Sequence, residues 1–166
     1  MGSFEIQTAS KIYPIFIGSE ASEKLPGFLQ EKFPRRKKLY LITDSHVSAL
    51  HADSLAGLLN QSGYDTLVHV VPSGEAAKSL ACYEECMTNG FRHHIGREGI
   101  ILALGGGVIG DLAGFVAATY MRGIPFIQLP TTLLAHDSAV GGKVGINHSL
   151  GKNLIGAFYQ PEAVVY

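Results

Sequence analysis

The fold is decided by residues 104–114, LGGGVIGDLAG, in which three successive glycines separate two apolar runs. The run before them, GIILALG at residues 99–105, has no charge and no alternation, as in a strand buried on both faces. The run after them, VIGDLAGFVAATYM at residues 108–121, is expected to form a helix. The glycines therefore lie at a junction between strand and helix.

Strand and helix patterns alternate on both sides of this junction. Further strands are expected at residues 4–9, 11–18, 37–44, 65–72, 125–130 and 162–166. Further helices are expected at residues 22–33, 45–63, 80–91 and 131–137. Residues 140–161 are expected to form a glycine-rich loop region. The alternation predicts an α/β fold, a Rossmann-like and mostly parallel sheet with helices on both faces.

The composition bounds the class of protein. A chain of 166 residues with 46% hydrophobic residues is long enough for one domain with a proper core. Its 13 basic and 14 acidic residues leave no net field for nucleic acid or an anionic membrane. No apolar run approaches the roughly 20 residues that span a bilayer, and the first residues lack a signal-peptide pattern. We expect a cytoplasmic protein.

Cysteines and histidines give no metal site by their spacing. Cys82 and Cys86 are four residues apart on one face of an expected helix, and are interpreted as buried thiols. The seven histidines form no H-x-x-x-H pair. No complete set of metal ligands can be written from these residues.

The glycine motif has two possible meanings. Gly105, Gly107 and Gly110 fit G-x-G-x-x-G, where bare backbone approaches a pyrophosphate and the first helical N–H groups point at it. The alternative is a simple tight turn. Two departures weaken the dinucleotide interpretation: the motif comes about a hundred residues into the chain, and the next strand ends without an acidic residue.

Two aspartates adjoin strand ends. Asp111 falls in the first turn of the helix, where it either stabilises the helix dipole or binds a ribose or nicotinamide. Asp44 ends an apolar strand, where it either caps the next helix or accepts the ribose hydroxyls of an adenosine.

Other polar residues also follow strands. Glu75 and Lys78 form either a solvated local ion pair or part of a binding loop. Thr131 and Thr132 provide either a helix cap or contacts to a pyrophosphate or ribose. A glycine-rich segment further along carries Asp137, Lys143, Lys152 and Asn153, which together suggest an anionic substrate.

The motif series closely resembles the 3-dehydroquinate synthase family. GGGVIGD at residues 105–111, TT at 131–132, GGK at 141–143 and GKN at 151–153 follow one another in order. PSGEAAKS at residues 72–79 is similar to the family's P-x-G-E-x-x-K loop. The resemblance runs from about Asp44 to the last residue, and it favours the pyrophosphate interpretation of the glycines.

The resemblance implies an enzyme of the shikimate pathway, which makes precursors of aromatic amino acids. The family binds NAD and a divalent metal, zinc or cobalt. It converts 3-deoxy-D-arabino-heptulosonate 7-phosphate to 3-dehydroquinate with loss of phosphate. NAD takes a hydride and returns it, so it is a catalytic cofactor.

The resemblance also implies roles for individual residues. The expected cofactor contacts are Asp44, Ser73, Gly74, Glu75, Lys78, Gly106, Gly107, Val108, Ile109, Gly110, Asp111, Thr131, Thr132, Asp137, Lys143 and Lys152. The expected catalytic residues are Asp137, Lys143, Lys152 and Asn153, of which the last three also bind substrate. Arg122 resembles an arginine that reaches a substrate phosphate from a neighbouring subunit, which implies a homodimer.

The family's metal ligands, one Glu and two His, are expected in a helical second domain beyond residue 166. Residues 1–166 are therefore interpreted as the amino-terminal NAD-binding domain of a two-domain enzyme, inactive alone. The alternatives are a related sugar-phosphate cyclase, a polyol dehydrogenase, or a non-catalytic NAD-binding module.

Overall fold

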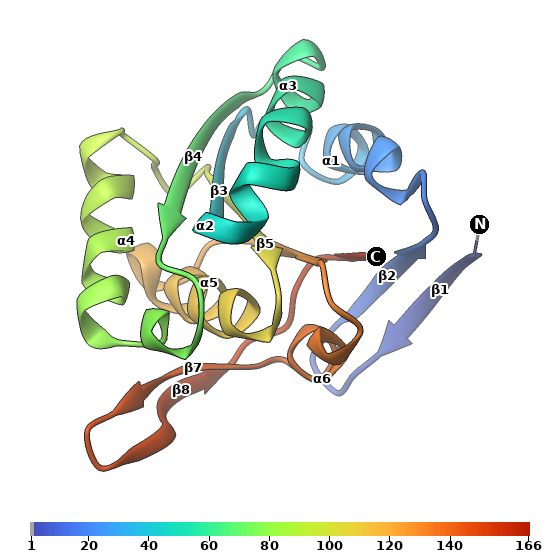
Figure 1. Ribbon diagram of the computed structural model, residues 1–166. Helices are drawn as coiled ribbons and strands as arrows, with labels where there is room; N and C mark the ends of the chain where they lie inside the picture. Colours follow the sequence, from blue (N-terminus) through green and yellow to red (C-terminus); the bar gives the residue numbers. More distant parts are fainter. Residues whose placement is uncertain (1) are drawn as a thin grey trace.

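A computed structural model describes residues 2–166, the side chains of residues 136 and 137 excepted. Within the described residues a seven-stranded sheet has the order β1-β2-β9-β6-β5-β3-β4, and β7 and β8 form a separate hairpin (Figure 1). The strands are β1 Gly2–Gln7, β2 Ile12–Ile17, β3 Lys38–Asp44, β4 Asp65–Val71, β5 Ile100–Gly105, β6 Phe126–Pro130, β7 Lys143–His148, β8 Gly151–Phe158 and β9 Val164–Val165. In the large sheet β1 runs antiparallel to β2, and the other paired strands run parallel.

Helices cover both faces of the large sheet. The α-helices are α1 Leu25–Lys32, α2 Ser45–Val47, α3 Asp53–Gln61, α4 Leu80–Arg92, α5 Gly107–Thr119 and α6 His136–Ala139. Short 3-10 turns are Ala21–Lys24, Glu75–Ala77, Tyr120–Arg122 and Leu133–Ala135, and a π-helical turn, Ser48–Ala52, joins α2 to α3. Helices α1 and α3 pack on one face, and α4 and α5 pack on the other. The predicted α/β fold is confirmed.

The alternation of side chains in β3 explains the two packed layers. Leu39 and Leu41 join the core under α1 and α3, whereas Tyr40 and Ile42 join the core under α4 and α5. All of these side chains are fully buried. A strand that is apolar at every position is therefore what a sheet covered on both faces requires.

The expected loop at residues 140–161 is wrong, because most of it forms the β7–β8 hairpin. Gly145 pairs with Gly156 across this hairpin. A Cβ on Gly145 would lie 2.5 Å from the carbonyl oxygen of Ile155, which no real side chain tolerates. These glycines let two strands approach closely, and they do not mark a loop.

A cluster of three charged residues joins both ends of the chain to α1, and we call it the terminal cluster. Glu162 accepts hydrogen bonds from Lys11 Nζ at 2.6 Å and Lys32 Nζ at 2.9 Å. Burial alone would raise the pKa of Glu162, but the two lysines outweigh burial and hold this pKa below its ordinary value. The cluster fastens the amino-terminal hairpin and α1 to the segment before β9.

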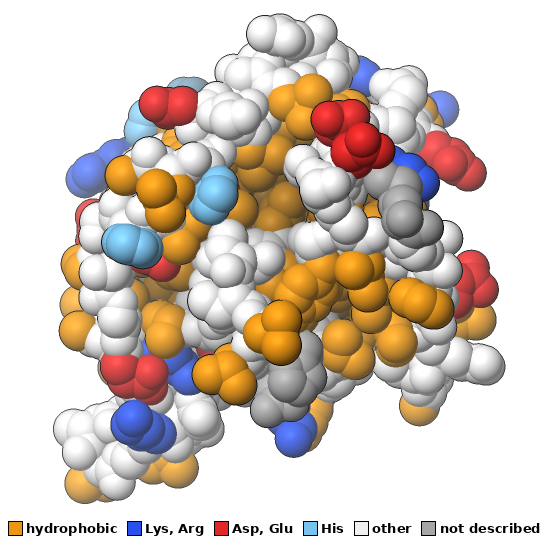
Figure 2. Space-filling model, turned by 45° about the vertical axis from the view of Figure 1, so that its right-hand side comes forward, with side chains coloured by type: hydrophobic (Ala, Val, Ile, Leu, Met, Phe, Trp, Pro, Cys, Tyr) orange, Lys and Arg blue, Asp and Glu red, His pale blue; other side chains and the backbone are white. Residues whose placement is uncertain are grey.

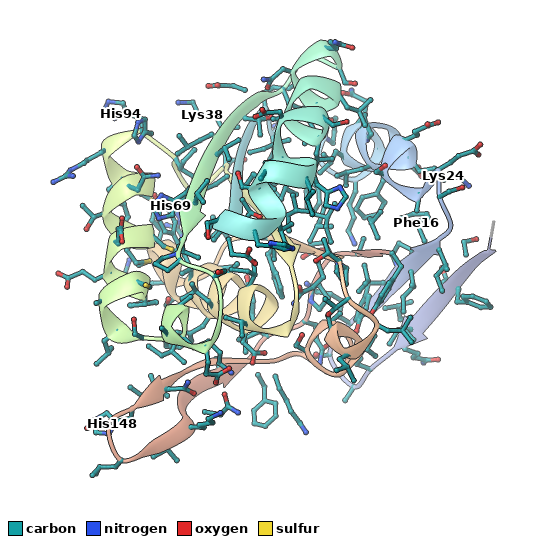
Figure 3. All side chains as sticks on the ribbon, viewed as in Figure 1. Phe16, Lys24, Lys38, His69, His94 and His148 are labelled. Carbon is teal, nitrogen blue, oxygen red and sulfur yellow. The ribbon has the colours of Figure 1, made fainter. Side chains whose placement is uncertain are left out.

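The cysteines are buried, and the histidines labelled in Figure 3 lie apart from one another. Both cysteines are free and buried, as expected. Figure 3 shows His69, His94 and His148 on separate parts of the molecule, the last at the tip of the β7–β8 hairpin. Figure 2 shows hydrophobic side chains gathered over the middle of one face. None of the described helices is both long enough and apolar enough to cross a membrane.

Candidate functional site

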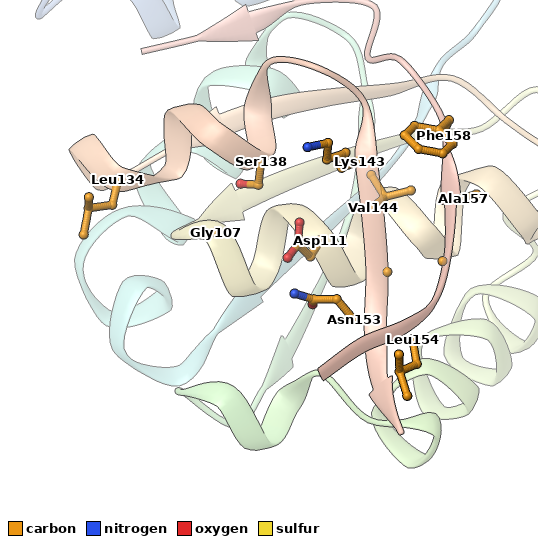
Figure 4. Close-up of a pocket in the computed structure, with 12 residues that line it drawn as sticks. Gly107, Asp111, Leu134, Ser138, Lys143, Val144, Asn153, Leu154, Ala157 and Phe158 are labelled. Carbon is orange, nitrogen blue, oxygen red and sulfur yellow. The ribbon is translucent and has the colours of Figure 1, made fainter. Parts of the chain in front are cut away.

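The site lies where the carboxyl ends of the parallel strands meet, which is where open α/β sheets bind ligands. The start of α5, α6 and the β7–β8 hairpin enclose a pocket of about 590 Å³ at this edge. Figure 4 shows Asp111 and Asn153 next to each other in this pocket, with Lys143 and Ser138 on its other side. Leu134 and Phe158 add apolar walls, and both are more than 80% exposed.

Two of the three motif glycines are required for packing, and the third faces open space. A Cβ on Gly105 would meet Ile109 at 2.7 Å, and a Cβ on Gly110 would meet Gln128 Oε1 at 2.9 Å, so both are needed for close packing of α5. A Cβ on Gly107 would meet nothing closer than Ser138 Oγ at 3.5 Å. Gly107 therefore faces open space in the pocket, at the first residue of α5.

The start of α5 is suited to an anion. Gly106, the residue before the helix, has no side chain that could cap it. The first N–H groups of any helix have no acceptor within the helix, and Gly107, Val108 and Ile109 supply these groups here. Together with the helix dipole, they favour negative charge at the pocket.

Lys78, Asp111 and Asn153 form a hydrogen-bonded group, in which Lys78 is buried and Asn153 is exposed, and we call it the pocket cluster. Lys78 Nζ donates to Asp111 Oδ2 at 2.6 Å and to Asn153 Oδ1 at 2.5 Å. The Lys78 side chain is only 5% exposed and that of Asp111 21%. Lys78 is therefore neither solvated nor paired locally with Glu75; its partners lie 33 and 75 residues away in sequence.

Electrostatics differ between the two acidic residues near Lys78. Burial raises the pKa of Asp111, and the hydrogen bond from Lys78 opposes this shift without cancelling it. A hydrogen bond from Asn147 lowers the pKa of the more exposed Glu75, with smaller contributions from Lys78 and Lys152. Lys152 is 75% exposed, and its Nζ lies 3.8 Å from Glu75 Oε1.

Asp44 and the two threonines lie at other strand ends of the same edge. Asp44 Oδ1 accepts the backbone N–H groups of His46 and Val47, which confirms the capping alternative. Thr131 and Thr132 are exposed directly after β6, and the Thr131 N–H donates to the Gly105 carbonyl. None of these three borders the pocket at the start of α5.

The remaining predicted residues lie in four different places. Lys143 borders the pocket, and Ser73 and Gly74 form the exposed loop before Glu75, with Gly74 at a φ of 88°. The side chain of Asp137 lies outside the described residues. Arg122 is exposed beyond the carboxyl end of α5. Because α5 has 13 residues and is about 20 Å long, Arg122 lies at the opposite end of this helix from Gly107, and it does not border the pocket in its own chain.

Sequence reasoning missed three residues around the site. Asn147 hydrogen-bonds the loop at residues 75–78, Ser138 borders the pocket, and Gln128 packs beneath Gly110 while only 2% exposed. A polar residue within an otherwise apolar strand, FIQLP, was the available signal for Gln128. Asn147 could have been noticed only once its segment was interpreted as a strand.

Comparison with known sequences relates this chain to one family. The family described as 3-dehydroquinate synthase N-terminal matches residues 68–166. The 3-dehydroquinate synthase of Geobacillus kaustophilus is 57% identical over 162 residues, covering 97% of this chain and 44% of the relative. That of Bacillus pumilus is 52% identical over 166 residues, covering 100% of this chain and 46% of the relative. The chain thus spans less than half the length of these relatives.

A solved structure extends the comparison to three dimensions. The crystal structure of 2-deoxy-scyllo-inosose synthase complexed with carbaglucose-6-phosphate, NAD+ and Co2+ has a TM-score of 0.89 and 26% sequence identity. The match covers 98% of this chain and 45% of that one. The family match, the two sequence relatives and this fold agree, and the chain belongs to the 3-dehydroquinate synthase family.

Proposed function

We propose that this chain is the NAD-binding part of a 3-dehydroquinate synthase. The complete enzyme would be a phosphate-eliminating lyase that converts 3-deoxy-D-arabino-heptulosonate 7-phosphate to 3-dehydroquinate. The observation that carries the proposal is the pocket at the start of α5, where Gly107, Asp111, Lys143 and Asn153 converge in a chain of this family. The 2-deoxy-scyllo-inosose synthase structure, which holds NAD+ and a phosphorylated sugar analogue, supports it.

The residues around α5 are suited to the pyrophosphate and nicotinamide of NAD. Gly106 and Gly107 leave the backbone bare, and a Cβ on Gly107 would enter the space that a phosphate needs. The N–H groups at the start of α5, from Gly107, Val108 and Ile109, would donate to phosphate oxygens. Bound NAD would supply a reversible hydride acceptor. Asp111 and the threonines after β6 would orient the cofactor.

The adenosine end of NAD is assigned to the loops after β3 and β4. Asp44, Ser73, Gly74, Glu75 and Lys78 are the contacts we propose there. Their support is position, because both strands end at the same edge as β5. Asp44 retains a second carboxylate oxygen beside the one that caps the helix.

The phosphorylated sugar-acid substrate is assigned to the hairpin side of the pocket. Lys143 and Asn153 border the pocket, and Lys152, the residue before Asn153, adds an exposed positive charge 3.8 Å from Glu75. Together with Asp137 they are the catalytic residues we propose. Arg122, at the opposite end of α5, would serve the pocket of a second copy in a homodimer.

The metal does not fit the described residues, which contain no group of three His, Cys, Asp or Glu side chains able to hold an ion. We propose that residues 1–166 are an NAD-binding domain that does not form 3-dehydroquinate alone. The cytoplasm is the compartment we propose, with neither nucleic acid nor membrane as a partner.

Calorimetric titration of NAD tests the proposal. Gly107→Ala should weaken binding at least about tenfold, because its methyl group blocks the close approach of phosphate. Gly57→Ala in α3 is the matched control, since a Cβ there meets nothing within 4 Å and lies in another helix. NAD binding that is equal in both variants, or absent from the unmodified chain, would contradict the assignment of this domain.

An enzyme assay tests the proposed inactivity, and sequence identity distinguishes the alternative enzymes. Formation of 3-dehydroquinate by the isolated chain would overturn its proposed inactivity. Identities of 52% and 57% to 3-dehydroquinate synthases, against 26% to 2-deoxy-scyllo-inosose synthase, favour a 3-dehydroquinate synthase over another sugar-phosphate cyclase.

A further inference from the structure

We infer that Asn147 is a positioning residue, which holds Asn153 at the pocket and Glu75 in the loop between β4 and α4. The inference deepens the proposed function, and only its nucleotide-binding readout rests on that function. The β7–β8 hairpin has a register shift where Asn147 lies.

The hairpin changes register at Asn147. Ile146 pairs with Ile155 and His148 pairs with Gly151, so Asn147 alone faces residues 152–154 of β8. Such a bulge leaves backbone groups without ladder partners and redirects side chains, often beside active sites. Asn153 lies in this bulge with a φ of 56°, a left-handed conformation that asparagine tolerates better than most residues.

Asn147 makes three hydrogen bonds that hold this bulge. Its Oδ1 accepts the Asn153 N–H at 2.9 Å, and its Nδ2 donates to Glu75 Oε1 at 2.9 Å. Its backbone N–H donates to the Lys78 carbonyl at 2.9 Å. One residue thus connects the hairpin to the loop between β4 and α4.

The Asn153 side chain completes a closed circuit. Asn147 fixes the Asn153 backbone, the Asn153 side chain accepts from Lys78 Nζ, and the Lys78 carbonyl accepts from Asn147. Lys78 Nζ also donates a hydrogen bond to Asp111, which borders the pocket. Loss of the Asn147 amide group would therefore release Asn153 and uncover Lys78, although Asn147 does not border the pocket itself.

Two substitutions separate the roles of this side chain. Asn147→Ala removes both side-chain bonds. Asn147→Asp keeps the acceptor for the Asn153 N–H but turns the donor to Glu75 into a second carboxylate, so it is combined with Glu75→Gln, which removes the repulsion. Leu150→Ala is the matched control, because Leu150 lies at the tip of the same hairpin and is 85% exposed.

Three measurements on the whole chain test the inference. Asn147→Ala should accelerate amide hydrogen exchange at Asn153 and acetylation of Lys78 by about five- to tenfold each, the effect of one lost hydrogen bond. It should also weaken NAD binding by a similar factor. Asn147→Asp combined with Glu75→Gln should restore slow exchange at Asn153 and slow acetylation of Lys78, and Leu150→Ala should change none of the three.

The outcomes are distinct. Unchanged acetylation of Lys78 in Asn147→Ala would overturn the inference. So would equal acceleration of exchange at Asn153 and at the paired residues of β7 and β8, because that would indicate general loosening of the hairpin. If the unmodified chain binds no NAD, the proposed function fails, while exchange and acetylation still decide the role of Asn147.

Discussion

The terminal cluster and the pocket cluster differ in how many cations face the buried carboxylate. Glu162 lies between two lysines, whereas Lys78 lies between one carboxylate and one amide. The pKa of Glu162 is lowered by its two cations, while burial raises the pKa of Asp111 against its single cation. In the terminal cluster two cations more than offset the cost of burying one carboxylate. In the pocket cluster a single cation does not fully offset that cost.

The largest expected effect is from breaking the pocket cluster. Lys78→Ala leaves the Asp111 carboxylate partly buried without its cation, and should lower the free energy of unfolding by about 3 kcal/mol. Lys152→Ala is the control, because this lysine is 75% exposed and its pair with Glu75 should contribute less than about 0.5 kcal/mol. Urea unfolding measures both, and equal losses would contradict the burial-based comparison.

A smaller effect is expected in the terminal cluster. Glu162→Gln removes the charge that two lysines share and should lower the free energy of unfolding by about 1.5 kcal/mol. Both lysines remain about one-third exposed, so solvent compensates part of the loss. Glu98→Gln is the control, since Glu98 is 78% exposed and 3.8 Å from Arg36. The comparison fails if the two glutamate variants unfold at the same urea concentration.

The smallest effect is a difference in pH dependence. Glu162 has a lowered pKa, so its stabilisation is present above its unfolded pKa and is lost as pH falls through the folded pKa. Asp111 has a raised pKa, so its contribution is present below its unfolded pKa and is lost as pH rises through the folded pKa. Unfolding of the unmodified chain, Glu162→Gln and Asp111→Asn between about pH 3 and 6 should give difference curves of opposite slope, each within about 1 kcal/mol. Slopes of the same sign would refute the opposition.

Local patterns predicted much of the fold. The uncharged apolar run that became β5 and the glycine junction into α5 were interpretable because strand, turn and helix start each depend on neighbouring residues. The cap at Asp44 was one of the two alternatives that the sequence offered for this residue, because its partners are two and three residues away.

The misses depend on contacts between distant residues. The β7–β8 hairpin was mistaken for a loop because Gly145 and Gly156 suggested flexibility, and only their pairing shows that they permit close approach. Lys78 was expected either in a local pair or in a binding loop, but its partners Asp111 and Asn153 come from α5 and β8. No sequence spacing reveals such partners before the topology is known.

The place of β9 has a consequence for synthesis on the ribosome. This strand is among the last residues of the chain, yet it lies between β2 and β6 in the sheet. The amino-terminal hairpin therefore waits, without its parallel neighbour, until residues 164 and 165 have emerged. Joining of the first and last segments gives the domain non-local contacts that slow folding. The nascent hairpin, with Ile15 and Phe16 not yet covered, is the part that a chaperone would protect during translation.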